Sequence, residues 1–328
     1  MYTKRSPNTF ILLILVAFLC LFPLAQALGT TPKAYCKQNY MAKKKAWLKE
    51  TKAERISRKL AARRPNPEGY CPLYRDDFVY FNTRVWSRGL EDDTPGSDKG
   101  LIWNRETGGA HLLNDNYAGY ITDEDTYIQD GALHLANQAR SYEGTDPAGS
   151  FDYTTGWVNS MGKLKFNGTR RAVRVELRAK FPVGTDVWPA IWLVTDERHW
   201  PPEIDIWEYF GKFFNVNNKV DMMALRYIYG TWQDKEDLSE EIIGFDGLYD
   251  LTQWHVYGWE WTENHMHWYL DGELIHSFTR DVDIPFDAWP DEDFSLVMNN
   301  GVMTVNAGKG AVYPNYLVID YIDIWQEH

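Results

Sequence analysis

The sequence predicts an all-β protein, one sandwich of two antiparallel sheets preceded by a short N-terminal region. From Tyr70 onward, short runs of β-branched and aromatic residues recur between turn signals, and Asp271-Gly272 is a strong hairpin signal. The 328 residues include 15 Trp, 20 Tyr and 15 Phe, a load typical of β-rich proteins and of surfaces that stack on flat apolar rings. No stretch after residue 65 has the spacing of a long amphipathic helix, so residues 70–328 are expected to form one domain.

Composition excludes several classes of protein. Hydrophobic residues make up 44% of the chain and charged residues 24%, an ordinary globular mixture that excludes disordered, collagen-like and coiled-coil chains. Three cysteines are too few for a disulfide-dense scaffold. The 34 Lys and Arg against 46 Asp and Glu give a net charge of −12, which is unevenly distributed along the chain.

Residues 1–27 have the three-part pattern of a secretory signal peptide. Lys4 and Arg5 form a basic start, an apolar run follows from Phe10 to Leu24, and a small-residue site ends at Ala27. The apolar run of about 15 residues is shorter than the roughly 20 that a membrane span needs, so an anchor is the less favoured alternative. The mature protein is therefore expected to be secreted, or to reside in the periplasm or cell envelope.

Residues 28–69 form a basic arm that is expected to be helical. From Thr30 to Arg64 there are 12 Lys and Arg and 2 Asp and Glu, whereas residues 65–328 carry a net charge of −24. The arm is rich in helix formers and is expected to end at the prolines Pro65 and Pro67. It could contact an anionic surface or its own acidic domain. Nucleic acid is not expected as a partner of an exported chain with so acidic a body.

Cys36 and Cys71 are the cysteines that remain once the signal peptide, with Cys20, is removed. Two cysteines in an exported protein can form one disulfide, and two unpaired thiols are the alternative. A bridge between Cys36 and Cys71 would close a loop around most of the basic arm.

Three carboxylates lie within six residues of one predicted strand. Glu203 and Asp205 are two apart and share a face, whereas Glu208 would point to the other face of a regular strand. One extra residue, a β-bulge at Ile206-Trp207, would return Glu208 to the first face. The alternative is an exposed acidic strand without a catalytic role.

Electrostatics assigns different roles to clustered carboxylates. Three such groups cannot all ionise easily at neutral pH, so one is expected to stay protonated and to serve as a general acid. Another stays ionised and can attack as a nucleophile, while the middle Asp205 can hold its geometry by a hydrogen bond. A retaining glycosidase needs two carboxyl groups about 5–5.5 Å apart, which this spacing permits.

Further motifs accompany the acids in a fixed order. The Trp-Pro-Ala-Ile-Trp segment that starts at Trp188 precedes them, and related segments cover Thr155–Phe166, Trp254–Gly272 and Ile319–Gln326. Together with the Glu-x-Asp-x-x-Glu strand, they resemble glycoside hydrolase family 16 over roughly residues 72–328.

The resemblance implies a β-jelly roll with a concave cleft and endo-acting, retaining cleavage of β-linked polysaccharides, without a cofactor for catalysis. By position, Glu203 would be the nucleophile, Asp205 its assistant and Glu208 the acid/base. The longer acid spacing is the one found in the family's laminarinases, agarases, porphyranases and carrageenases. A transglycosylase, or a non-catalytic carbohydrate-binding protein on the same fold, is the alternative, and a monomer is expected.

Two departures from the laminarinase pattern leave the substrate open. Pro201-Pro202 stands before Glu203 in place of a small-residue turn, and Arg226 lies on the next strand, where many laminarinases carry a His. A galactan, which could be sulfated, and a β-1,3-glucan are therefore both candidate substrates.

Substrate contacts are expected from three tryptophans and one arginine. Trp188 and Trp192 share a strand face, and Trp200 directly precedes the acids, so all three could stack on sugar rings. Burial in the sandwich core is the alternative, above all for Trp192. Arg226 could bind a sulfate or a uronate, or could form an ion pair within the protein.

Two weaker signals concern metals. Asp320 is, by position in the family, a candidate ligand for a structural Ca²⁺. His265 and His267 form an HxH pair that could bind a metal, but no third ligand stands at a convincing spacing along the chain. A metal-dependent enzyme of the cupin type needs a Glu three or four residues after the pair, whereas Glu273 lies six past His267. A packed or exposed strand pair is therefore favoured.

Overall fold

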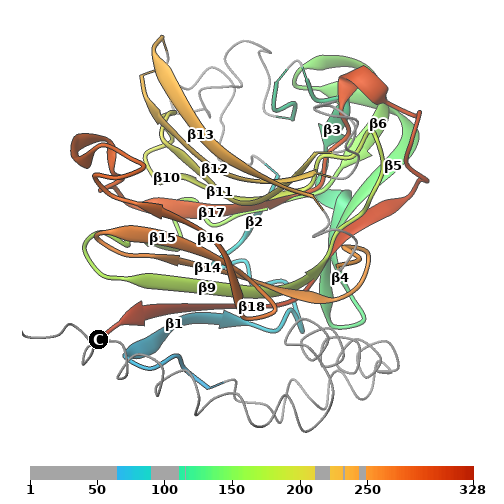
Figure 1. The fold of residues 1–328 in the computed structure, drawn as a ribbon. Helices are drawn as coiled ribbons and strands as arrows, with labels where there is room; N and C mark the ends of the chain where they lie inside the picture. The colour runs from blue at the N-terminus through green and yellow to red at the C-terminus, as the bar shows by residue number, and fades with distance from the viewer. Residues whose placement is uncertain (1–64, 90–110, 115, 211–221, 232, 244–248) are drawn as a thin grey trace, which may run out of the picture. The chain divides into compact units, whose positions relative to one another are not determined.

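The structure is a computed structural model, and it describes residues 65–89, 111–114, 116–210, 222–231, 233–243 and 249–328 (Figure 1). These residues all fall within one compact unit. The signal peptide, nearly all of the basic arm and Cys36 lie outside the described residues, so the predicted cleavage, helix and disulfide stay predictions. Among the residues described, helical structure is confined to three short 3₁₀ turns, and no helix is long and apolar enough to cross a membrane.

The first sheet has ten strands, in the order β16-β15-β14-β9-β18-β5-β6-β3, with β1 paired to β18 and β4 paired to β5. Its pairs are antiparallel except for β3 and β6, which are parallel. The strands are β1 Tyr70–Asp76, β3 Gly119–Ile121, β4 Thr126–Gln129, β5 Ala132–Thr145, β6 Ala148–Thr155, β9 Val173–Lys180, β14 His255–Trp261, β15 His265–Leu270, β16 Glu273–Thr279 and β18 Asn315–Glu327.

The second sheet has eight strands, in the order β13-β12-β11-β10-β17-β7-β2, with β8 paired to β17. Figure 1 shows it as a curved layer stacked on the first sheet. The strands are β2 Ser87–Arg88, β7 Trp157–Asn159, β8 Lys165–Phe166, β10 Ala190–Thr195, β11 Glu203–Phe210, β12 Met222–Gly230, β13 Lys235–Ile243 and β17 Phe294–Asn299. The prediction of a two-sheet antiparallel sandwich is confirmed.

The core fills the space between the two sheets. Strand β14 sends Tyr257, Trp259 and Trp261 inward at every second position, as a strand with one buried face must. The alternate residue Glu260 stays on the outer face, half-buried. Large aromatic side chains therefore account for much of the core, which explains the unusual aromatic content of the chain.

Candidate active site

The acidic strand β11 carries the β-bulge that its residue spacing predicts. Trp192 of β10 lies opposite Asp205 and Ile191 lies opposite Trp207, so two residues of β11 face one step of β10. The register with β12 shifts at the same place, between Asp205 and Glu208. Consecutive residues Ile206 and Trp207 both enter the inter-sheet core, which turns Glu208 back to the face of Glu203 and Asp205.

Each of the two glutamates receives a hydrogen bond from an indole. Trp200 Nε1 donates to Glu203 Oε2 at 2.7 Å, and Trp188 Nε1 donates to Glu208 Oε1 at 2.7 Å. Charge-assisted hydrogen bonds of this kind fix the orientation of a carboxylate. The two carboxyl groups are therefore held in place before any substrate arrives.

Arg226 of β12 is the cationic partner of the acidic row. Its Nη1 donates to Glu208 Oε2 at 2.9 Å, and its Nε lies 3.8 Å from Asp205 Oδ2. On its other side the guanidinium pairs with Asp237 of β13. Its side chain is 19% exposed, so the structure shows an ion pair within the protein, the alternative to a free sulfate-binding arginine.

Burial and mutual repulsion raise the pKa values of two of the acids. Loss of hydration raises the pKa of Glu203 to about 7, with the charge of Glu208 adding to the increase and Arg226 opposing it. Burial and the charges of both glutamates raise the pKa of Asp205 well above its usual range. The raised pKa favours a proton on Asp205, which can donate a hydrogen bond to Glu203 and lower the pKa of that glutamate.

The acids line a cleft of about 580 Å³. A volume of this order suits a ligand of several rings and matches the concave sites that bind small molecules. The described residues around it are Leu113, Asn114, Asn116, Tyr117, Trp188, Ala190, Trp192, Trp200, Glu203, Asp205, Glu208, Arg226, Ile228, Lys235, Asp237 and Asn299.

All four predicted substrate-binding residues border this cleft, but their availability differs. Trp188 and Trp200 are partly exposed beside the glutamates. Trp192 is only 5% exposed: its indole donates to Asn299 Oδ1 at 2.7 Å and packs edge-on against Trp157. Little of the Trp192 ring is left for stacking on a sugar, whereas Trp188 and Trp200 present the wider aromatic surfaces.

The structure adds residues that sequence reasoning missed. Asn299, at the end of β17, donates to the hydroxyl of Tyr117 at 2.6 Å, and both side chains border the cleft. Asp237 shares Arg226 with Glu208, and the ammonium of Lys235 lies 4.4 Å from the centre of the Trp200 ring. These contacts join segments far apart in the chain, and the sequence holds no local signal for them.

The remaining predicted site residues lie outside the cleft. Asp320 is fully buried and accepts a hydrogen bond from Arg178 Nη1 at 2.6 Å. That carboxylate already has a cation beside it, which is a poor setting for a calcium ligand, and calcium binding there stays a prediction. Cys71 is exposed, with its Sγ 3.2 Å from His328 Nδ1.

Comparison with known proteins agrees with this geometry. A family profile, Glycosyl hydrolases family 16, matches residues 117–322. A β-glucanase from Rhodothermus marinus is 28% identical over 74% of this chain and 84% of its own length. A glucan endo-1,3-β-glucosidase A1 from Niallia circulans is 26% identical over 74% of the chain, which spans only 38% of that protein.

Two further comparisons concern a galactosidase and a solved structure. A keratan-sulfate endo-1,4-β-galactosidase from Sphingobacterium multivorum is 25% identical over 89% of this chain and 63% of its own length. Among solved structures, an endo-β-1,3-glucanase from Pyrococcus furiosus superposes with a TM-score of 0.61 at 22% identity, covering 79% of this chain and 95% of the other. That structure supports the fold alone.

Proposed function

The chain belongs to glycoside hydrolase family 16, and we propose that it is an endo-acting, retaining hydrolase of neutral β-glucans. As a member of that family it is a glycosidase that acts on O-glycosyl bonds. The observation that carries the proposal is the bulged strand β11, which sets Glu203, Asp205 and Glu208 side by side along an open cleft. An open cleft lined by aromatic rings suits a polymer that is cut within its length.

We propose double displacement, with a role for each acid. Glu203, ionised, attacks the anomeric carbon and forms a glycosyl ester, while Glu208 gives its proton to the departing glycosidic oxygen. Glu208 then takes a proton from the water that hydrolyses the ester. Asp205 donates a hydrogen bond to Glu203 and orients it.

The contacts of Glu208 imply a rearrangement on substrate binding. Trp188 and Arg226 each donate a hydrogen bond to one of its two oxygens. An oxygen that carries the catalytic proton turns from acceptor to donor, so one of these contacts has to open as the glycosidic oxygen arrives. Arg226 has a second partner in Asp237, which can retain the guanidinium when Glu208 is protonated.

The charge of the cleft favours a neutral polymer. Among the described residues, four carboxyl groups border it, those of Glu203, Asp205, Glu208 and Asp237, and so do two cations, Arg226 and Lys235. With a proton on Asp205 and on the general acid Glu208, the negative and positive charges of the cleft balance. Arg226 is engaged by two of those carboxylates. A sulfated chain would therefore find no excess of positive charge to bind it, so the sulfated galactan is the weaker candidate.

An unsulfated galactan is the second candidate substrate. The keratan-sulfate endo-1,4-β-galactosidase aligns with 89% of this chain, and a galactose chain without sulfate would need no cation in the cleft. Transfer of the glycosyl group to a sugar hydroxyl, in place of water, would use the same covalent intermediate.

Digestion of a polysaccharide panel tests the proposal. Laminarin, mixed-linkage glucan, agarose, porphyran, carrageenans and keratan sulfate are incubated with the protein, and mass spectrometry identifies the products. We expect oligosaccharides of several lengths from a β-glucan, and none with Glu203→Gln. Products from the sulfated polymers alone would contradict the charge argument, and products longer than the starting oligosaccharide would reveal transglycosylation.

The pH dependence of kcat/KM is expected to have an acid limb near pH 7. Glu203 attacks only when ionised, and its pKa is raised to about 7, so the rate falls about tenfold for each pH unit below that value. Initial rates on a soluble substrate across the pH range measure the limb. An acid limb near pH 4.5, the ordinary range of a glutamate, would show that the nucleophile is not the desolvated Glu203.

The variant Trp200→Phe is expected to move this acid limb upward by about one pH unit. The indole N–H lowers the pKa of Glu203 by stabilising its charged form, and a hydrogen bond to a charged group contributes about 1.5 kcal/mol or more. Phe keeps an aromatic ring beside the acids, so KM should change little. The matched control is Trp188→Phe, which removes the donor to Glu208 and should leave the limb of Glu203 nearly in place.

We also propose export, from the signal pattern of residues 1–27. Expression of the full chain in a secreting host, followed by intact-mass measurement of the released protein, tests it. Loss of the first 27 residues is expected, whereas retention of the full chain in the membrane fraction would support the anchor.

A further inference from the structure

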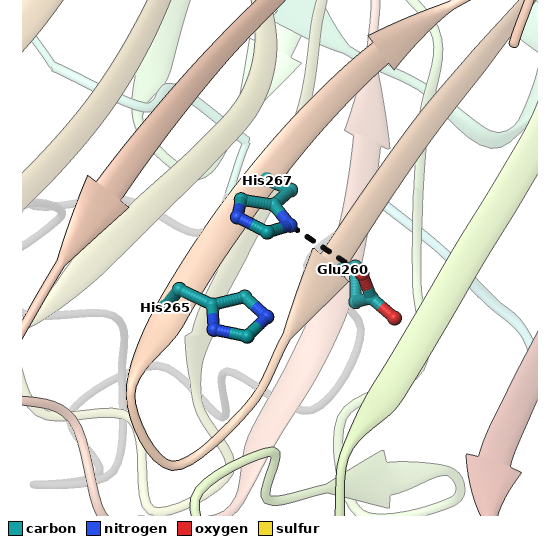
Figure 2. Close-up of side chains that lie close together, drawn as sticks. All are labelled: Glu260, His265 and His267. Carbon is teal, nitrogen blue, oxygen red and sulfur yellow. Dashed lines mark ion pairs between the residues drawn. The ribbon is translucent and has the colours of Figure 1, made fainter. Parts of the chain in front are cut away.

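The outer face of the ten-stranded sheet carries a cluster of three metal-ligand side chains. His265 and His267 are alternate residues of β15, and Glu260 lies directly opposite His267 on β14. Figure 2 shows both imidazoles on one side of the hairpin, with Glu260 facing His267. The inward neighbours Met266 and Trp268 are fully buried, so the cluster sits on the face of β15 opposite the core.

The spacing of the three side chains is close to that of a coordination sphere. One ligand atom from each lies within 4.8 Å of the others, and His267 Nδ1 is 3.5 Å from Glu260 Oε2. Zinc–ligand bonds of about 2.0–2.1 Å place neighbouring ligands of a tetrahedral site about 3.3 Å apart. Glu260 and His267 are nearly at that separation, and small side-chain rotations would bring His265 into range.

The contacts of the cluster orient it for a cation. Tyr70 donates to Glu260 Oε1 at 2.6 Å and Tyr269 donates to Glu260 Oε2 at 3.1 Å, an arrangement typical of ligand carboxylates held by an outer shell. The two imidazole rings stack with their centres 4.0 Å apart. This packing keeps one nitrogen of each ring within 4.8 Å of the other and of a carboxylate oxygen of Glu260.

The guanidinium that lies beside the cluster has partners of its own. Arg174, opposite Glu260 on β9, pairs with Glu176 at 2.9 Å and lies over the ring of Tyr269. All three ligand residues are partly exposed, so an ion can enter from solvent and a water molecule can complete its shell. Two imidazoles and one carboxylate suit zinc and neighbouring transition metals, and they disfavour calcium and magnesium.

We propose that Glu260, His265 and His267 bind one Zn²⁺ ion, with water as the fourth ligand. The ion would join β14 to β15 across the hairpin and stabilise the folded protein by mass action. Because the acids of the cleft lie on the other sheet, the ion has no part in the proposed hydrolysis. The inference is thus independent of the proposed function.

Calorimetric titration of the full-length protein with ZnCl₂ tests the site. One equivalent is expected to bind with a dissociation constant on the order of micromolar, and His267→Ala should weaken it at least tenfold. Glu260→Gln keeps the shape of the side chain and one acceptor oxygen but removes its charge, so it should also weaken binding tenfold or more. An excess of Ca²⁺ should not compete.

Cys71→Ser is the matched control, because Cys71 Sγ and His328 Nδ1 are another pair of atoms that could bind zinc, 3.2 Å apart. This variant should still bind one equivalent of Zn²⁺ with the affinity of the wild type. A hundredfold excess of Zn²⁺ over its dissociation constant should raise Tm by on the order of 5 °C in the wild type and in Cys71→Ser, but not in His267→Ala. Binding that survives both His267→Ala and Glu260→Gln, or that disappears in Cys71→Ser, would overturn the assignment.

Discussion

Replacing Glu203 with Gln is expected to lower kcat by roughly 10⁴-fold or more, while the protein stays folded and becomes more stable above neutral pH. An amide cannot attack the anomeric carbon, so no glycosyl ester forms. The amide oxygen can still accept the hydrogen bond from Trp200, and the cleft should keep its shape. Initial rates on the best substrate of the panel, with circular dichroism as the control for folding, measure the loss.

The stability gain follows from the raised pKa of Glu203. Its folded-state pKa of about 7 exceeds the ordinary 4.5, so the stability that this group contributes is complete below about pH 4.5 and is lost as the pH rises through 7. Gln carries no charge to desolvate, and the variant should gain about 3 kcal/mol above pH 7 and almost nothing near pH 4. Thermal unfolding at both pH values measures the difference.

Two outcomes would contradict this account of Glu203. Activity of Glu203→Gln within tenfold of the wild type would exclude this residue as the nucleophile. A variant that is inactive but equally destabilised at both pH values would instead point to a structural role, because loss of packing does not depend on the ionisation of a single carboxyl group.

Replacing Glu208 with Ala is expected to affect the two chemical steps, formation and hydrolysis of the glycosyl ester, to different extents. On the natural polysaccharide kcat should fall by roughly 10²–10⁴-fold, the usual contribution of general acid–base catalysis. On an aryl glycoside with a good leaving group, the first step needs no acid, so the glycosyl ester on Glu203 should form and accumulate. Its hydrolysis then lacks a base and becomes rate-limiting.

Sodium azide provides the measurement for Glu208→Ala. Azide needs no general base, so it should restore turnover of the aryl glycoside and yield a glycosyl azide of retained configuration, detectable by mass spectrometry and NMR. Glu203→Ala is the matched control: there azide would attack directly and give the inverted configuration. An unrescued Glu208→Ala that is fully folded would remove the acid/base role from this residue.

The fold and the acid row could be predicted because their signals are local. The period-two alternation of strands such as β14 is written in the sequence, and the bulge follows from the three-residue step between Asp205 and Glu208 when all acids must share one face. The alternation and the bulge each depend on residues within one strand. They can therefore be predicted without knowing which strands lie beside it.

The partners of these residues depend on long-range register and could not be predicted. The sequence allows Arg226 either to bind a sulfate or to form an ion pair within the protein. Only the structure decides for the ion pair, because β13 places Asp237 beside Arg226 and β11 places Glu208 there. Trp192 has the strand position of a sugar platform, yet its contacts with Asn299 and Trp157 bury it. Such pairings join positions as much as 107 residues apart.

The third ligand of the histidine pair also depends on strand pairing and could not be read from sequence spacing. Along the chain after His267, the next acidic ligand type beyond the turn is Glu273, which lies six residues past His267. The sheet instead places Glu260 opposite His267, from the preceding strand of the hairpin. A turn of known length between the strands fixes that register, so a hairpin alignment of residues 254–272 is the signal that could have revealed Glu260.

The stereochemistry of the first product tests the central claim most directly. Proton NMR of the anomeric region, recorded during the first turnovers on a β-linked oligosaccharide and before mutarotation, shows which hemiacetal forms first. Double displacement through Glu203 predicts that the β-anomer appears first and the α-anomer grows in slowly afterwards. Initial release of the α-anomer would mean single displacement by water, and it would contradict the roles given to Glu203 and Glu208.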